Sequence, residues 1–187
     1  YEPLLAFMAL ATGLPVRLVL TLEETFQAVR RGAAEVHVRT GFQRDGTIVF
    51  RDVEANYQIG AYADIADRTV AKGRYTSMGP YRTRSARIVA RSVLSHTVPS
   101  TAFRGFGNPQ QIWAVESNMD EAAERLGIDP LELRLRNLAP PGDPFIPGDR
   151  PADGDWAVTV RKAAEMIDWT TAPAPGRGRG LAVGLKS

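Results

Sequence analysis

Residues 35–57, EVHVRTGFQRDGTIVFRDVEANY, decide the fold class of this chain. Residues 35–40 and 47–57 are rich in the β-branched and aromatic side chains that strands favour. The QRDG turn between them contains Asp45 and Gly46, a pair that supplies the positive φ of a tight turn. The stretch therefore predicts an antiparallel β-hairpin.

Upstream of the hairpin, two helices and a strand are predicted. Residues 2–12 are rich in leucine, alanine, methionine and phenylalanine, which favour a helix, and a Gly and a Pro follow them. Residues 15–21, PVRLVLT, have the composition of a strand. Thr21 and Glu24 have the spacing of a capping box, so a second helix is expected to run from there to about Arg31.

Downstream of the hairpin, strands and helices mix without strict alternation. Residues 58–67 are predicted to end a strand or form a loop, and a short helix should follow to about Arg74. Residues 85–97 predict a strand, and helices are expected at 110–126, 129–138 and 156–169. The pattern indicates an α+β fold, or a mixed α/β fold, with a mixed sheet, an antiparallel hairpin and packed helices.

The composition excludes several functions. Of the 187 residues, 44% are hydrophobic and 24% charged, which is typical of a globular protein. A net charge of +2 with scattered basic residues argues against binding to nucleic acid or to a membrane surface. The absence of cysteine excludes disulfides and thiolate-bound iron–sulfur clusters within the chain, and two distant histidines do not suggest a metal site. No membrane-spanning run or signal sequence is visible, so we expect a cytoplasmic protein.

One segment has the features of a ligand site: TAFRGFGNPQ, residues 101–110, between a predicted strand and a long helix. Unpaired N–H groups at a helix N-terminus suit anions and oxo groups. Gly105 allows a ligand to approach the backbone closely, and Arg104 supplies a cation with directed donors. Alternatively, this is a Gly-rich turn in which Phe103 and Phe106 fill the core while Arg104 pairs with a carboxylate. Spacing alone favours this second interpretation.

Two other groups of polar residues give weaker signals. Asp120, Glu121 and Glu124 are interpreted as the solvated face of a helix. Ser95 and His96 lie in a predicted strand without the third member of a hydrolase triad.

The loop TAFRGFGNPQ resembles the signature loop of the molybdenum hydroxylases, a family that includes xanthine dehydrogenases and aldehyde oxidases. The segments TGLPVRLVLTLEE, GFQRDGTIVFRDVEANYQIGAYAD, MGPYRTRSARI and ESNMDEAAERLGIDPLELRLRNL resemble the same subunit, in the same order. The resemblance runs from about Glu2 to about Gly184.

The resemblance implies a function. The large subunit of this family binds a molybdopterin-type cofactor and hydroxylates an aldehyde or N-heteroaromatic carbon, with water as the source of oxygen. Electrons leave through iron–sulfur clusters and FAD on partner domains or subunits. By this resemblance, Arg104 and Gly105 border the cofactor, Phe106 packs against the substrate, and Lys72 stands where purine-oxidising members have an arginine.

The resemblance also implies an incomplete site. The family's Gly-rich molybdenum loop should precede Tyr1 and its glutamate base should follow Ser187, so no catalytic residue and no direct metal ligand is expected in this chain. We expect residues 1–170 to be part of the molybdopterin-binding domain, and 171–187 to be a linker and the start of a following strand, at about 181–185. Alone, the chain should be inactive and metal-free.

Two further expectations follow. Apolar side chains along Leu4, Leu5, Phe7 and Met8 should be exposed, and an exposed face of this kind favours a homodimer. The alternative function is a structural or assembly module that binds no cofactor.

Overall fold

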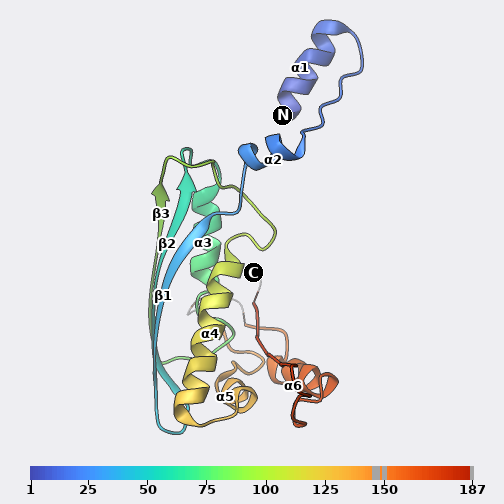
Figure 1. Ribbon diagram of the computed structural model, residues 1–187. Helices are drawn as coiled ribbons and strands as arrows, with labels where there is room; N and C mark the ends of the chain where they lie inside the picture. Colours follow the sequence, from blue (N-terminus) through green and yellow to red (C-terminus); the bar gives the residue numbers. More distant parts are fainter. Residues whose placement is uncertain (145–147, 149–150, 186–187) are drawn as a thin grey trace.

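The computed structural model describes residues 1–144, 148 and 151–185. Its sheet and helices confirm an α+β fold (Figure 1). The elements in chain order are α1 (Glu2–Thr12), α2 (Leu22–Ala28), β1 (Ala33–Phe42), β2 (Ile48–Gly60), α3 (Ala66–Thr76), β3 (Ser85–Leu94), α4 (Asn108–Leu126), α5 (Pro130–Asn137) and α6 (Trp156–Met166).

The predicted hairpin is confirmed, because β1 and β2 pair antiparallel. Its turn closes through the N–H of Gly46, which donates to the carbonyl of Gln43 at 2.9 Å. Gly46 has a φ of +88°, as a turn of this type requires. The Asp45 carboxylate accepts from the N–H of Thr47 at 2.9 Å and fixes the next residue.

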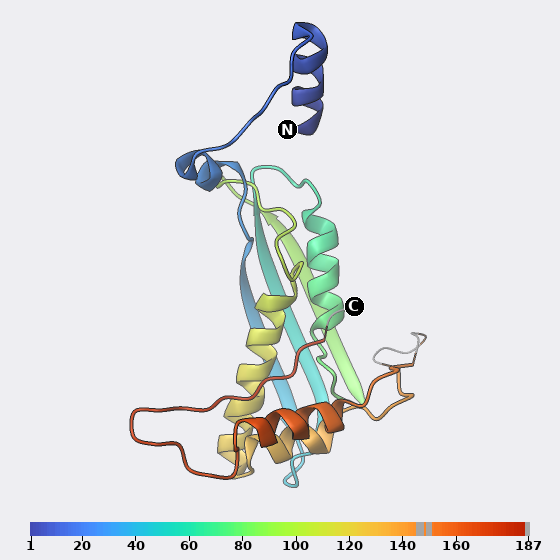
Figure 2. The same ribbon diagram turned by 90° about the vertical axis from the view of Figure 1, so that its right-hand side faces the viewer.

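The sheet is mixed, since β3 pairs with β2 in parallel and the strand order is β1-β2-β3. A parallel neighbour needs a crossover, and α3 provides it. Both α3 and α4 lie on one face of the sheet, with α4 against β1 and α3 against β3 (Figure 2). The other face is open among the described residues.

The core lies between the sheet and these helices. Alternate side chains of β2, among them Val53, Ala55, Tyr57 and Ile59, are buried. One apolar cluster extends from Ile48 through α4, α5 and α6, and a second joins β2 to α3. Because side chains alternate along a strand, Asp52, Glu54 and Asn56 lie on the open face. Arg51 is the exception, a polar side chain that is buried on the helix side.

That open face carries an ion-pair group on neighbouring strands. Arg87 contacts Asp52 at 3.0 Å and Glu54 at 2.6 Å, and Arg39 contacts Asp52 at 2.5 Å. Hydrogen bonds from Arg39 and Arg87 lower the pKa of Asp52, and the one from Arg87 lowers the pKa of Glu54.

Replacing Arg87 by methionine is therefore expected to raise the pKa of Glu54 more than that of Asp52, which keeps Arg39. A carboxylate with a lowered pKa stabilises the fold above its unfolded pKa of about 4, and this contribution is lost as the pH falls through the folded pKa. The variant should thus lose less stability than the wild type between about pH 4 and pH 2. NMR titration of the carboxyl groups measures the pKa values of Glu54 and Asp52, with Arg44→Met in the exposed turn as the control. A Glu54 pKa unchanged in Arg87→Met would contradict it.

Two predicted strands are wrong. Residues 15–21 run as a connector between α1 and α2, because no strand of the described chain lies beside them to pair. Residues 181–185 also form no strand. They lie across α4, where the N–H of Val183 donates to the Glu116 carboxylate at 2.9 Å and the Asn108 amide donates to the carbonyl of Leu185 at 3.3 Å. We call residues 181–185 the strap.

Residues 1–29 form an arm that projects away from the sheet (Figures 1 and 2). Neither α1 nor α2 has a buried side chain. The capping box of Thr21 and Glu24 is present, as predicted, and begins α2. Leu4, Phe7 and Met8 are exposed, also as expected, whereas Leu5 is half-buried.

The helices that the structure describes are all too short or too polar to cross a membrane.

Candidate functional site

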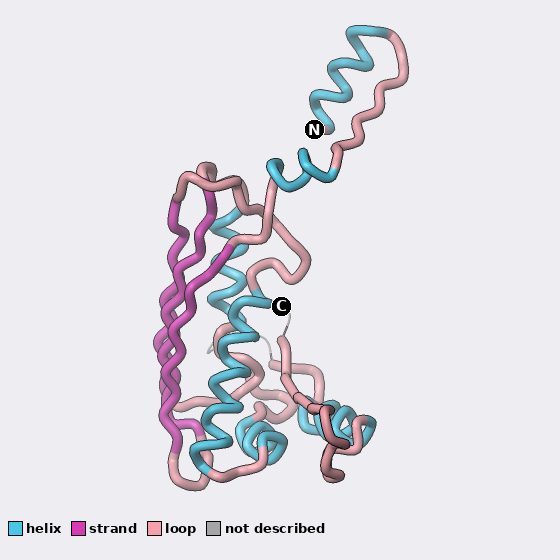
Figure 3. The backbone as a smooth tube through the Cα atoms, in the orientation of Figure 1, coloured by secondary structure: helices cyan, strands magenta, loops and turns pink. Residues whose placement is uncertain are grey.

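The TAFRGFGNPQ loop connects β3 to α4 and bulges away from the sheet (Figure 3). Its first residues are tied to two other segments. The N–H of Thr101 donates to the carbonyl of Arg30 at 3.3 Å, and its hydroxyl donates to the Asp64 carboxylate. These bonds hold the start of the loop in place, and we call this start the stem of the loop.

Three successive residues of the loop have left-handed backbone: Gly105 (φ +97°), Phe106 (φ +50°) and Gly107 (φ +87°). A phenylalanine in this region is strained by about 1–3 kcal/mol, so its surroundings must hold it there. A Cβ on Gly105 would lie 2.5 Å from Cγ of Pro109, and one on Gly107 would lie 2.2 Å from the carbonyl oxygen of Thr69. Both glycines are thus required by space as well as by φ.

The start of α4 is anchored from the side of the sheet. The Tyr57 hydroxyl donates to the carbonyl of Gly107 at 2.9 Å and accepts from the Gln111 amide at 3.0 Å. Burial raises the pKa of Tyr57, so this hydroxyl stays protonated. No side chain caps α4; instead the N–H of Asn108 donates to the carbonyl of Gly105 at 3.1 Å, and Pro109 has no N–H.

The structure contradicts the interpretation of this loop as a packed turn. Phe103 is 53% exposed, and Phe106 is half-buried but belongs to neither apolar cluster. Arg104 is exposed, and its guanidinium makes no hydrogen bond or ion pair with any part of the chain that the structure describes. Both aromatic rings and the cation are accordingly free of the core.

Lys72 lies on the helix turn that touches this loop. A Cβ on its neighbour Gly73 would be 3.0 Å from the carbonyl of Gly107. Lys72 itself is exposed, with Nζ 5.7 Å from the centre of the Tyr75 ring. The fold therefore brings the backbone around Lys72 to the predicted site residues.

Sequence reasoning missed Arg31, which contacts the loop from outside it. Its Nη2 donates to the carbonyl of Arg104 at 2.6 Å, and its guanidinium carbon lies 4.4 Å from the centre of the Phe103 ring. Below these contacts is a cavity of about 10 Å³, lined in part by Arg31, Gly107 and Gln110. This volume suits about one water molecule and excludes a substrate.

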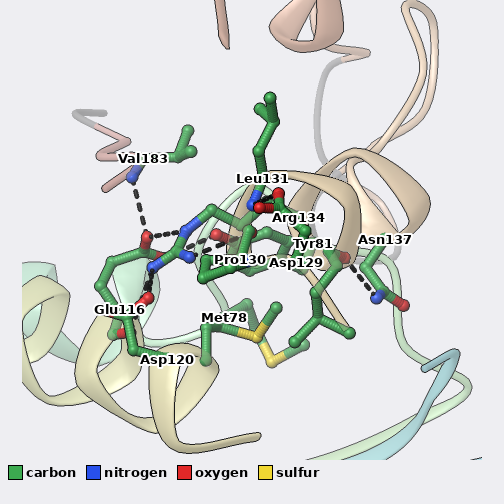
Figure 4. Close-up of polar contacts among 12 residues, drawn as sticks. Met78, Tyr81, Glu116, Asp120, Asp129, Pro130, Leu131, Arg134, Asn137 and Val183 are labelled. Carbon is green, nitrogen blue, oxygen red and sulfur yellow. Dashed lines mark hydrogen bonds and ion pairs between the residues drawn. The ribbon is translucent and has the colours of Figure 1, made fainter. Parts of the chain in front are cut away.

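A buried ionic group holds the other half of α4 (Figure 4). We call Tyr81, Glu116, Asp120 and Arg134 the Glu116 cluster. Glu116 accepts from the Tyr81 hydroxyl at 2.7 Å and from Nε of Arg134 at 2.9 Å, and Asp120 contacts Nη2 of Arg134 at 2.8 Å. Glu116 and Arg134 are almost fully buried.

The pKa values in this region follow from burial and charge. Burial, followed by the charge of Glu116, raises the pKa of Tyr81. Burial alone would lower the pKa of Arg134, but Glu116 and the other partners outweigh it and raise that pKa. Burial lowers the pKa of the adjacent Arg51 to about 10, since this guanidinium has the carbonyl of Met78 rather than a carboxylate as its partner at 2.6 Å. The cluster joins helices and the strap, and is structural.

The described chain is thus an α+β module in which a loop with an exposed arginine and a left-handed backbone leads into its longest helix. Comparisons with known proteins identify it further. A family model described as the molybdopterin cofactor-binding domain matches residues 1–138. The chain belongs to this family.

Several relatives support the assignment. The chain is 35% identical over 151 residues to the aldehyde oxidoreductase of Megalodesulfovibrio gigas, covering 80% of this chain and 17% of that protein. It is 34% identical over 172 residues to a putative xanthine dehydrogenase molybdenum-binding subunit of Escherichia coli, covering 90% and 23%. The solved aldehyde oxidoreductase from Desulfovibrio gigas superposes with a TM-score of 0.70 and 29% identity, covering 91% and 20%. The chain thus spans about a fifth of the length of these relatives.

Proposed function

We propose that this chain is the part of a molybdenum hydroxylase that borders the cofactor and the substrate. The protein that carries it would oxidise an aldehyde or an N-heteroaromatic carbon, and pass electrons to iron–sulfur clusters and FAD on other domains or subunits. The observation that carries the proposal is the loop at residues 103–107, with its left-handed backbone and free arginine, in a chain of the molybdopterin cofactor-binding domain family.

The residues present fit a large, oxygen-rich group. Gly105 has no side chain to block its approach, and the Arg104 guanidinium is exposed and can donate several hydrogen bonds. When bound, a molybdopterin-type cofactor supplies oxidation of the substrate carbon with water as the oxygen source. Arg104 and Gly105 would hold and orient this group.

The substrate side of the site would be formed by Phe106 and Lys72. The Phe106 ring, on a left-handed backbone, lies outside both apolar clusters. It can therefore serve as a flat apolar wall for an aromatic or aldehyde substrate. Lys72 would place a cation near an electron-rich edge of the substrate. The buried Tyr57 hydroxyl next to this loop is committed to Gly107 and Gln111. The proposed work of Phe106 and Lys72 is therefore binding, orientation and exclusion of water.

Replacing Arg104 by methionine tests the proposal in the whole protein that carries this chain. We expect molybdenum content or kcat/KM to fall about tenfold or more, because a charge-assisted donor is lost from the site. Stability should be unchanged, since the side chain is exposed and unpaired in the fold. Metal analysis, steady-state kinetics and thermal unfolding measure the three effects.

Arg44→Met, which removes an exposed arginine from the hairpin turn, is the matched control. Normal metal content together with normal activity in Arg104→Met would contradict the assignment of Arg104. A wild-type protein that holds no molybdenum would instead support a structural or assembly module.

A further inference from the structure

Arg31 lies outside the signature loop, yet its side chain is directed at the centre of it. We propose that Arg31 is a positioning residue, which fixes the peptide between Arg104 and Gly105 and so presents the Gly105 N–H to the cofactor side of the loop. The inference rests on the proposed function, and it assigns to Arg31 no contact with substrate or cofactor.

The backbone of Arg31 is fixed before its side chain acts. The neighbouring Arg30 forms a parallel bridge with Ser100, in which the N–H of Arg30 donates to the carbonyl of Pro99 at 3.1 Å. Gly32 passes so close to Ser100 that a Cβ on the glycine would lie 3.0 Å from the hydroxyl oxygen. The start of β1 and the stem of the loop therefore move as one unit.

From this base the Arg31 guanidinium makes two contacts with the loop. It donates to the carbonyl of Arg104 at 2.6 Å and covers the ring of Phe103 at 4.4 Å. A planar guanidinium can do both at once, by stacking its face on the ring while its edge donates. A lysine could donate but could not stack in the same way.

The hydrogen bond decides which way one peptide group faces. The described chain has no cis peptide, so the C=O of Arg104 and the N–H of Gly105 point in opposite directions. Because Arg31 binds the C=O, the N–H of Gly105 is turned away from Arg31. The N–H of Phe106 donates to the carbonyl of Phe103 at 2.8 Å, so Arg104 and Gly105 are the central residues of a turn. Such a turn can keep this hydrogen bond with its central peptide in either orientation, because a glycine tolerates both signs of φ. The bond from Arg31 to the Arg104 carbonyl favours the orientation in which Gly105 has a φ of +97°.

A second link ties the same segment to α4. The Gln110 amide donates to the carbonyl of Gly32 at 2.8 Å. Nη1 of Arg31 and Oε1 of Gln110 are buried without a hydrogen-bond partner among the described residues, and both side chains line the cavity of about 10 Å³. One water molecule there would bridge the donor and the acceptor, and would connect Arg31 to the first turn of the helix.

The first test measures the loop itself. Hydrogen–deuterium exchange of peptides covering residues 101–112 is compared in the holoprotein and in Arg31→Met, Arg31→Lys and Arg30→Met. We expect exchange in this segment to be about tenfold faster in Arg31→Met, since a charged donor to the loop is lost, and intermediate in Arg31→Lys. Arg30→Met is the matched control, because Arg30 also donates several hydrogen bonds, but to Gln58, Thr97 and Val98 rather than to the loop.

The second test separates positioning from stability. With molybdenum content matched, kcat of Arg31→Met should fall about tenfold to a hundredfold, while Arg30→Met stays within about threefold of the wild type. Equal exchange in wild type and Arg31→Met would overturn the inference, as would faster exchange with unchanged kcat. If the wild type neither holds molybdenum nor oxidises aldehydes or N-heteroaromatic compounds, the proposed function fails, and the exchange data still decide whether Arg31 orders the loop.

Discussion

Replacing Glu116 by glutamine is expected to lower the free energy of unfolding by about 3–5 kcal/mol, the usual cost of removing one partner from a buried ion pair. The carboxylate accepts from Tyr81, Arg134 and the N–H of Val183, and all of these donors are buried. Without this charge, the guanidinium of Arg134 keeps one charged partner, the exposed Asp120, besides the carbonyl oxygens of Pro130 and Glu116. A glutamine has nearly the same volume, so the effect reports on charge and hydrogen bonding rather than on a cavity.

Asp120→Asn is the matched control, because Asp120 contacts the same guanidinium at 2.8 Å from a side chain that is 57% exposed. Exposed ion pairs contribute about 1 kcal/mol or less, so this variant should be close to the wild type. Urea unfolding curves give both free energies. Equal losses in the two variants would show that burial of Glu116 does not control the strength of the cluster.

Replacing Gly107 by alanine is expected to lower the free energy of unfolding by about 3 kcal/mol or more and to displace the loop from α3. Two effects add: an alanine at φ +87° is strained, and its Cβ would lie 2.2 Å from the carbonyl oxygen of Thr69, which is helix backbone and cannot move alone. Because Gly107 is also the residue before α4, the change should reduce cofactor retention as well as stability.

Gly127→Ala separates these two effects. Gly127 ends α4 with a φ of +65°, and a Cβ there would meet nothing within 4 Å. Gly127→Ala should therefore lower the free energy of unfolding only by the backbone strain, about 1–2 kcal/mol. Thermal unfolding of both variants and metal analysis of the holoprotein measure the difference. A Gly107→Ala protein as stable as Gly127→Ala would mean that the loop can withdraw from α3 without loss.

The elements predicted best were those with local signals. The Asp45-Gly46 turn, the capping box at Thr21 and the Gly127 stop all depend on residues within four positions of each other, and the structure has each of them. The strands predicted at 15–21 and 181–185 were wrong for a common reason. Composition suits a strand, but a strand exists only with a neighbour to pair, and pairing is decided by segments far away in the sequence.

The site was predictable to the extent that glycines and aromatics mark a loop. Residues 101–110 could be singled out from their own sequence, whereas Arg31 acts across 73 positions and no local pattern points to it. Glu116 was missed because it shares α4 with Asp120, Glu121 and Glu124. The sequence does not distinguish these acidic residues, whereas the structure shows that Glu116 faces the core.

The strap at residues 181–185 stays on α4 partly because it is covalently connected to the rest of the chain, so its own affinity for the helix can be low. It is held on α4 by the two hydrogen bonds to Glu116 and Asn108 and by the burial of Val183 and Leu185. As a separate peptide, so few contacts would bind weakly. The exposed connector at 170–178 keeps the strap near α4 at an effective concentration on the order of millimolar, so that weak contacts suffice to close the side of the helix that leads into the loop.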